Sequence, residues 1–201
     1  MKTDYVLDMY DAAVDPWGFT SRWYEQRKYA LTMAALPRPE LGRVAEPGCS
    51  LGVLTQQLAR RADHVVAGDL VPAAVDLARE RLIEAGLADR VTLRHWDLRD
   101  PWPDGPFDLV VLSEVVYYLE PDEARDLLDR AVASLASGGH LLAAHWRPVV
   151  PEYPMTGDQA QAVVRATAGL APVASYLDDD LTLDLLGRGE ARSVATVEGL
   201  R

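Results

Sequence analysis

The first part of the sequence that could do chemistry is Glu46 to Gly52, a glycine-rich stretch that begins with a carboxylate. It reads EPGCSLG, and the small residues at positions 48, 50 and 52 allow a sharp turn and a close approach of the backbone to a ligand. The spacing differs from the Gly-x-Gly-x-x-Gly fingerprint of dinucleotide-binding folds. Because similar turns join strands to helices in many α/β proteins, a ligand cradle and a purely structural turn are both open at this point.

Two further carboxylates stand at the ends of the next two apolar runs. Asp69 ends HVVAGD, where a carboxylate could accept both hydroxyls of a ribose. Asp97 ends VTLRHWD, where it could accept an exocyclic amine while Trp96 or Leu98 flanks an adenine face. Each acid also has an ordinary interpretation, since Asp69 could cap the helix beginning near Pro72 and Asp97 could initiate a turn.

Short apolar runs alternate along the chain with longer amphipathic ones, which indicates alternating strands and helices. We expect strands in GRVAEPG, HVVAGD, VTLRHWD, FDLVVLSEV and HLLAAHW, and helices in VLTQQLARRA, PAAVDLARERLIEAGL and PDEARDLLDRAVASLASGG. This order predicts an α/β fold, with a doubly wound, mostly parallel sheet and helices on both faces. Ligands of such sheets bind at the carboxyl ends of the strands, where Glu46, Asp69, Asp97 and Ser113 would converge.

The ends of the chain are expected to extend this core. SRWYEQRKYALTMAAL predicts a helix before the first strand, and QAQAVVRATAGL predicts a helix after a proline-rich loop. PVASYLDDDLTLDLLGR predicts an antiparallel hairpin at the edge of the sheet. We expect little regular structure in residues 194–201.

Charge and cysteine content restrict the class of protein. The formal net charge is −11, which argues against nucleic acids and anionic membranes as partners, because phosphate binding needs clustered positive charge. No apolar run is long enough to span a bilayer and no secretory signal is visible, so we expect a cytoplasmic protein. The only cysteine, Cys49, cannot form an internal disulfide, and the four histidines lack zinc-site spacing, so no metal is expected.

The ordered set of EPGCSLG, Asp69, Asp97 and FDLVVLSEVVYYL resembles the class I S-adenosylmethionine-dependent methyltransferases over roughly residues 41–146. The resemblance implies a Rossmann-like fold, S-adenosyl-L-methionine as cofactor and S-adenosyl-L-homocysteine as product. It places the methionyl part at the first loop, ribose at the second acid, adenine at the third, and methyl transfer beside Ser113 to Tyr118. The implied cofactor-binding residues are Glu46, Pro47, Gly48, Cys49, Ser50, Gly52, Asp69, Leu70, Asp97, Leu98, Ser113 and Glu114.

A narrower set, DPWGF, WYEQRKYALTMAALPR, EPGCSLGVLT, LSEVVYYL and HWR, is similar to the nodulation protein S (NodS) group. That group implies N-methylation of the de-N-acetylated amino sugar of a chitooligosaccharide, so the expected acceptor is an oligosaccharide or small molecule bearing an amine. We expect one methyltransferase domain over residues 1–201, as a monomer or homodimer. It would comprise a helical lid at 1–36, a cofactor-binding core at 41–146, and an acceptor-side loop, helix and edge strands at 147–193.

Several side chains are candidates for specific roles within this resemblance. Arg27 is the expected partner of the methionyl carboxylate, and Trp17 or Tyr24 could close over the sulfonium, although these aromatic rings could equally be core residues. An amine must be neutral to attack, so a group that takes its proton would help. The candidates for that role, and for contact with the acceptor, are Glu114, Tyr117, Tyr118 and His145.

Three other functions compete with this interpretation. An O-methyltransferase of a small natural product would use the same cofactor site. An NAD-binding oxidoreductase is disfavoured because the glycine spacing suited to a pyrophosphate is missing. A non-catalytic binding module is disfavoured because Glu46, Gly48, Gly52, Asp69 and Asp97 occur together.

Overall fold

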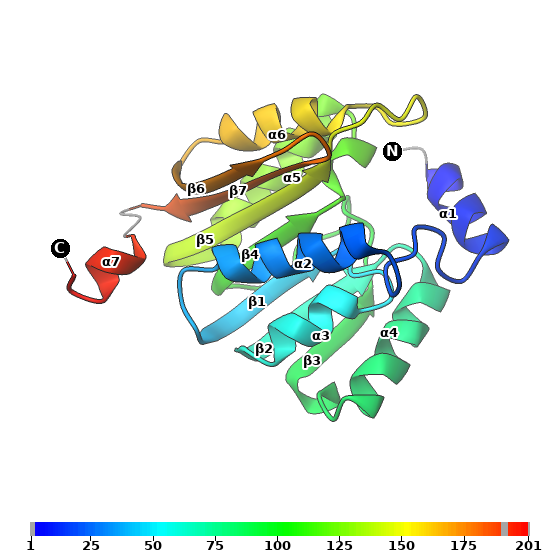
Figure 1. The fold of residues 1–201 in the computed structure, drawn as a ribbon, viewed down its shortest axis with the longest axis horizontal. Coiled ribbons are helices and arrows are strands. Elements are labelled where there is room, and N and C mark those ends of the chain that lie inside the picture. The colour runs from blue at the N-terminus through cyan, green and yellow to red at the C-terminus, as the bar shows by residue number, and fades with distance from the viewer. Residues whose placement is uncertain (1–2, 190–192, 201) are drawn as a thin grey trace.

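A seven-stranded sheet forms the centre of the computed structural model, which describes residues 3–189 and 193–200 (Figure 1). Its strands are β1 (Leu41–Pro47), β2 (Ala62–Asp69), β3 (Val91–His95), β4 (Phe107–Ser113), β5 (Leu135–Trp146), β6 (Leu170–Leu177) and β7 (Leu181–Arg188). The spatial order is β3-β2-β1-β4-β5-β7-β6. Strands β1 to β5 are parallel, and β7 pairs antiparallel with both β5 and β6. The predicted doubly wound sheet and its C-terminal edge hairpin are confirmed.

Helices cover both faces of the sheet. They are α1 (Thr3–Ala12), α2 (Trp23–Ala35), α3 (Val53–Ala59), α4 (Pro72–Glu84), α5 (Pro121–Ser134), α6 (Gly157–Arg165) and α7 (Val194–Val197), with short 3-10 turns η1 (Ala88–Arg90) and η2 (Val116–Tyr118). None of these helices, within the described ranges, is long and apolar enough to cross a membrane.

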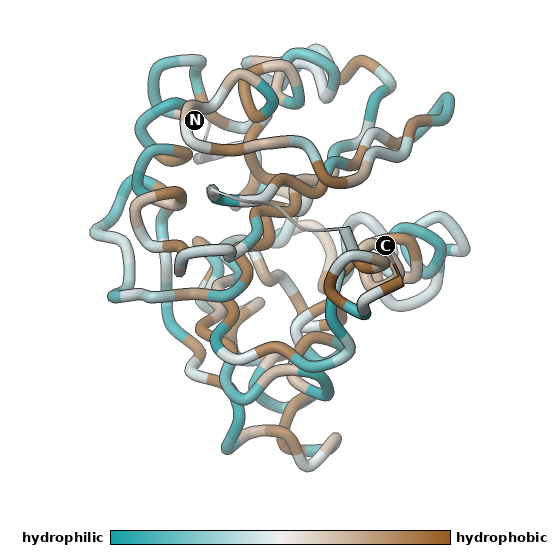
Figure 2. The backbone as a smooth tube through the Cα atoms, turned by 90° about the vertical axis from the view of Figure 1, so that its left-hand side faces the viewer, coloured by the Kyte–Doolittle hydropathy of each residue, from teal (hydrophilic) through white to brown (hydrophobic). Residues whose placement is uncertain are grey.

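The alternation of side chains along the strands explains the two covered faces. Val44 packs with residues of α2 and α3, whereas the next residue, Ala45, packs with residues of α5 and α6. Val110 and Val111 on β4 divide between the same two clusters, because successive strand residues point to opposite faces. Figure 2 shows the hydrophobic segments gathered in the interior and the hydrophilic ones in the outer loops.

Two terminal helices differ from the sequence-based expectations. The sequence analysis did not predict α1, whose Val6 and Tyr10 lie four residues apart and pack together against Leu51 and Val71. Residues 194–197 form the short helix α7, where little regular structure was expected. Figure 1 shows α1 and α7 at opposite ends of the molecule.

The turn from β1 into α3 lies where the strand order reverses between β1 and β4. The backbone N–H groups of Gly48 and Cys49 both donate to the carbonyl oxygen of Gly68, at 2.7 and 2.9 Å, which fixes the turn against the end of β2. Gly48 and Gly52 have φ of 78° and 72°, in the left-handed region that favours glycine. The turn is therefore shaped by its backbone, as the sequence suggested.

Gly68 is the point in β2 at which the turn, β2 and β3 are held together. A Cβ atom there would lie 2.5 Å from the carbonyl oxygen of Arg94 and 2.8 Å from Cβ of Trp96. We expect Gly68→Ala to lower the free energy of unfolding by about 1–3 kcal/mol, because β3 would have to shift. Urea denaturation measures this loss. The exposed Val149 provides a control, since Val149→Ala should stay within about 0.5 kcal/mol of the parent protein, and equal midpoints for both variants would contradict the prediction.

Candidate active site

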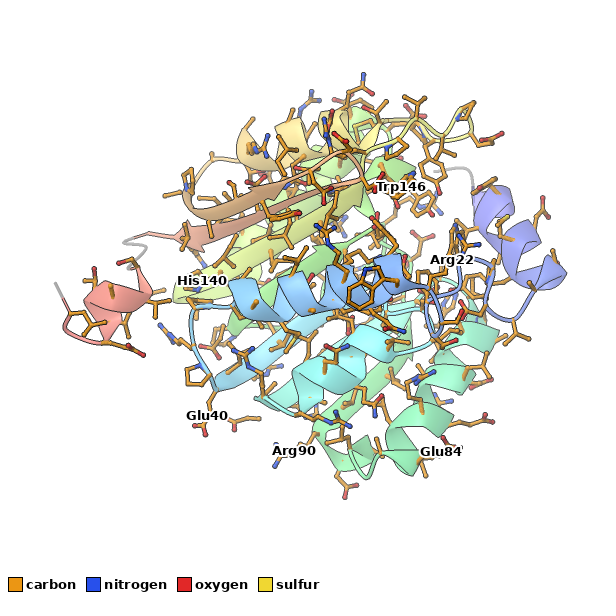
Figure 3. The ribbon with its side chains drawn as sticks, in the orientation of Figure 1. Arg22, Glu40, Glu84, Arg90, His140 and Trp146 are labelled. Atoms are coloured by element: carbon orange, nitrogen blue, oxygen red, sulfur yellow. The ribbon has the colours of Figure 1, made fainter. Side chains whose placement is uncertain are left out.

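A cavity of about 400 Å³ lies at the carboxyl ends of β1, β2, β4 and β5, under α1 and the start of α2. Figure 3 shows Arg22 and Trp146 at this end of the sheet and His140 at the other end of β5. The sequence-predicted residues that line the cavity are Trp17, Tyr24, Glu46, Gly48, Cys49, Ser50, Asp69, Leu70, Leu98, Ser113, Glu114, Tyr117 and Tyr118. The remaining candidates, Arg27, Pro47, Gly52, Asp97 and His145, do not line it.

Glu46 presents a carboxyl group to the cavity from β1. The residue is 3% exposed, and its Oε2 atom has no hydrogen-bond partner among the described residues. Burial raises the pKa of Glu46 to about 8. An orphaned buried carboxyl oxygen in a cavity wall is a site for a hydrogen-bond donor from a ligand.

Asp69 is held in a fixed orientation at the end of β2. It accepts hydrogen bonds from the backbone N–H groups of Ser50, at 2.9 Å, and Val71, at 3.0 Å. Burial raises the pKa of Asp69, and these N–H groups oppose the shift. The carboxylate therefore supports the turn before α4 and also lines the cavity, so both interpretations from sequence are compatible.

Asp97, which follows β3, does not lie where the sequence analysis expected it. Trp96 and Leu98 line the cavity, whereas Asp97 lies outside it and pairs with Arg99. Its Oδ1 atom accepts from Nε of Arg99 at 2.9 Å, and Arg99 lowers the pKa of Asp97. In this geometry the carboxylate of Asp97 is paired with a guanidinium and does not line the cavity, so it is not placed to accept an exocyclic amine there.

Arg27 of α2 was expected to bind the methionyl carboxylate, but its side chain points away from the cavity. Its Nη1 atom lies 2.7 Å from Oδ2 of Asp178, and its Nη2 atom donates to the hydroxyl of Tyr176. Arg27 therefore ties α2 to the β6–β7 hairpin. The cations that line the cavity are Arg22 and Lys28, which the sequence analysis missed. Neighbouring residues of a helix lie about 100° apart, so an error of one position changes the face.

Glu114, just after β4, is the most heavily hydrogen-bonded carboxylate of the site. It accepts from Nζ of Lys28 at 3.1 Å and from the hydroxyl of Tyr24 at 3.3 Å through Oε1. Its Oε2 atom accepts from the hydroxyl of Tyr117 at 2.7 Å and from the backbone N–H of Trp146 at 2.8 Å. Burial alone would raise the pKa of Glu114, but Lys28 and these donors outweigh it and lower the pKa. A carboxylate stabilised in this way is a weak proton acceptor.

A cluster of tyrosines lines the end of the cavity next to Glu114. The rings of Tyr117 and Tyr153 stack with centroids 4.7 Å apart, and the hydroxyls of Tyr118 and Tyr153 are 3.1 Å apart. Tyr5 of α1 contacts Tyr153 edge to face, with centroids 5.7 Å apart. Burial raises the pKa of Tyr117 and of Tyr118, so both are neutral phenols at ordinary pH.

His145, the remaining candidate for taking a proton, lies behind this tyrosine wall. Its ring contacts that of Tyr117 at 5.3 Å between centroids, and its Nδ1 atom is 2.6 Å from Oε1 of Gln161. The residue is fully buried, and burial lowers its pKa. His145 is therefore a neutral residue of the buried interior that does not line the cavity, whereas the sequence analysis expected it to contact the acceptor.

Two further candidates have a structural explanation. Gly52 packs against Ala78 of α4, and a Cβ atom there would lie 2.9 Å from Cβ of Ala78. Burial raises the pKa of the Cys49 thiol well above its usual range, so this thiol is not a reactive nucleophile.

Among the residues that the structure describes, no group of three or more His, Cys, Asp or Glu side chains could hold a metal ion.

Comparison with known proteins gives a consistent result. Residues 44–139 match the family model of the methyltransferase domain. Nodulation protein S from Rhizobium tropici is 31% identical over 133 residues, which make up 65% of this chain and 55% of that relative. This chain therefore spans little more than half the length of that curated relative.

Two solved structures share this fold. One is a Pseudomonas syringae protein inferred to be a methyltransferase, which is 40% identical, with a TM-score of 0.71 over 83% of this chain and 100% of that one. The other is the N-methyltransferase NodS from Bradyrhizobium japonicum in complex with S-adenosyl-L-homocysteine, with a TM-score of 0.83 and 23% identity over 94% of this chain and 100% of that one. On the family match and the 40% identical relative, this chain belongs to the class I S-adenosylmethionine-dependent methyltransferases.

Proposed function

We propose that this protein transfers the methyl group of S-adenosylmethionine to the nitrogen of a small amine-bearing acceptor, such as an amino sugar. The observation that carries the proposal is one cavity that joins Glu46 and Asp69, at the ends of adjacent strands, to a tyrosine-lined end beside Glu114. The similarity to nodulation protein S and to the N-methyltransferase NodS supports nitrogen as the acceptor atom.

The lining residues fit this cofactor at each of its parts. The unpartnered Oε2 atom of Glu46 suits the methionyl ammonium, and Arg22 suits the methionyl carboxylate. Asp69 would accept the ribose hydroxyls, while Trp96 and Leu98 offer apolar contacts to adenine. The cofactor, when bound, supplies a methyl group that its sulfonium activates for displacement.

The protein's own contribution to such a transfer is alignment and exclusion of water. Helix α1 and the start of α2 cover the cavity, which supports a lid role for residues 1–36. The acceptor would occupy the end bounded by Tyr117, Tyr118 and Tyr153, where the paired hydroxyls of Tyr118 and Tyr153 offer a hydrogen bond to an amine. Because Glu114 is already engaged by four donors, the acceptor would enter as a neutral amine and release its proton to solvent after transfer.

Removing the Asp69 carboxylate tests the cofactor site. We expect Asp69→Ala to weaken binding of S-adenosylhomocysteine by about 10- to 100-fold, because hydrogen bonds to a charged group are lost. Isothermal titration calorimetry measures the affinity, and circular dichroism confirms folding. Asp97→Ala is the matched control and should bind nearly as the parent does, since Asp97 lies outside the cavity. Parent-like binding by Asp69→Ala would refute the proposed site.

The raised pKa of Glu46 predicts a pH dependence of binding. Below pH 8 the free protein holds a proton on Glu46, and a cationic methionyl ammonium would favour loss of that proton. The affinity for S-adenosylmethionine should therefore rise by up to about tenfold per pH unit as the pH approaches 8 from below. Calorimetry across pH measures the change. Glu46→Gln cannot ionise and should remove the dependence, and the same slope in this variant would assign it to another group.

Turnover with a labelled methyl donor identifies the acceptor atom. The acceptors to compare are amino sugars, chitooligosaccharides with and without one free amine, and small phenols. Label on nitrogen, and none on fully acetylated oligosaccharides, is the expected outcome. Label on hydroxyl groups alone would replace N-methylation with O-methylation at the same cofactor site.

A further inference from the structure

Three charged side chains form a buried triad in the wall of the cavity. Nζ of Lys28 lies 2.7 Å from Oε2 of Glu25 and 3.1 Å from Oε1 of Glu114. Lys28 is 2% exposed and Glu25 is 5% exposed, and all three residues line the cavity. Because α2 contributes two members and the end of β4 the third, the triad spans the junction between the lid and the sheet.

Aromatic rings enclose the ammonium of Lys28. Its Nζ atom lies 5.7, 5.5 and 5.2 Å from the ring centroids of Phe19, Tyr24 and Tyr29. Cation–π contacts and the two carboxylates therefore surround this charge, which is far from bulk water. Burial lowers the pKa of Lys28, but Glu114 and Glu25 outweigh it and raise the pKa overall.

The triad has more negative than positive charge. Lys28 holds Glu114 ionised, and it also opposes the rise that burial imposes on the pKa of Glu25. With both carboxylates ionised, two negative charges face one positive charge. The other cation of the cavity wall, Arg22, packs its side chain along Gly18 in the segment before α2. In that state, with Glu25 ionised, the triad carries one net negative charge beside the tyrosine-lined end.

We infer that the Glu25–Lys28–Glu114 triad makes the site selective for a neutral amine over a phenolate or another anionic acceptor. This inference rests on the proposed methyl transfer in this cavity. An amine nitrogen forms the new N–C bond as the C–S bond breaks, so positive charge leaves sulfur and appears on nitrogen before a proton departs. The negative triad stabilises that charge. A phenolate would bring a second negative charge into the same low-dielectric wall, and its reaction creates no positive charge for the triad to stabilise.

Paired ligands that differ in one charge test the inference without knowledge of the acceptor. Sinefungin has a carbon bearing an ammonium in place of the methylated sulfonium, whereas S-adenosylhomocysteine has a neutral sulfide there. The quantity to measure is the ratio of their dissociation constants by calorimetry, at alkaline pH so that Glu25 is ionised. We expect Glu25→Gln and Glu114→Gln each to reduce the preference for sinefungin by roughly fivefold.

A matched control separates local charge from overall charge. Glu84→Gln removes the same charge from the exposed end of α4, far from the cavity, and should leave the ratio unchanged (Figure 3). Glu25→Gln decides the outcome if Glu114→Gln does not fold, because Glu114 also anchors Tyr24, Tyr117 and Trp146. An unchanged ratio in Glu25→Gln, with S-adenosylhomocysteine still bound, overturns the triad inference alone. Failure of the parent protein to bind either ligand overturns the proposed function as well.

Discussion

The hydrogen bonds that one buried carboxylate, Glu114, requires determine how the parts of this site come together. A buried charge is stable only when donors replace the water that it loses. Its donors come from three elements, namely Tyr24 and Lys28 of α2, Tyr117 of η2, and the backbone of Trp146 at the end of β5. Glu114 itself has φ of 60°, a strained conformation for a non-glycine residue, which such a set of partners can maintain. The position of α2 over the sheet therefore follows from this requirement.

The features of the fold that were predicted from the sequence are those that follow from one local pattern of residues. The alternation of buried strands with amphipathic helices predicted the sheet and its helical layers, because period and burial are readable along the chain. Glu46 and Asp69 reached the cavity for the related reason that parallel strands end at one edge of the sheet. Strand order and strand ends together restrict where a side chain can lie, even without knowledge of its partners.

The remaining site residues depend on tertiary contacts that no local pattern contains. Arg27 and Lys28 have similar charge and adjacent positions, and the pairing of Arg27 with Asp178 of the distant hairpin decides which one turns outwards. Asp97 likewise turns towards Arg99, and His145 is covered by the ring of Tyr117. Helix α1 was not predicted because its apolar side chains, Val6 and Tyr10, are covered only by a tertiary contact with the surface formed by Leu51.

The separation of α1 and α7 has a practical consequence for handling the protein. Helix α1 forms part of the outer wall of the cavity through Tyr5, Val6 and Tyr10, whereas α7 lies beyond the opposite end of the sheet (Figure 1). A fluorophore, affinity tag or solid support joined after α7 is thus kept away from the cavity. The same attachment placed before α1 would sit beside a wall of the cavity, so immobilised binding assays should use the C-terminal side.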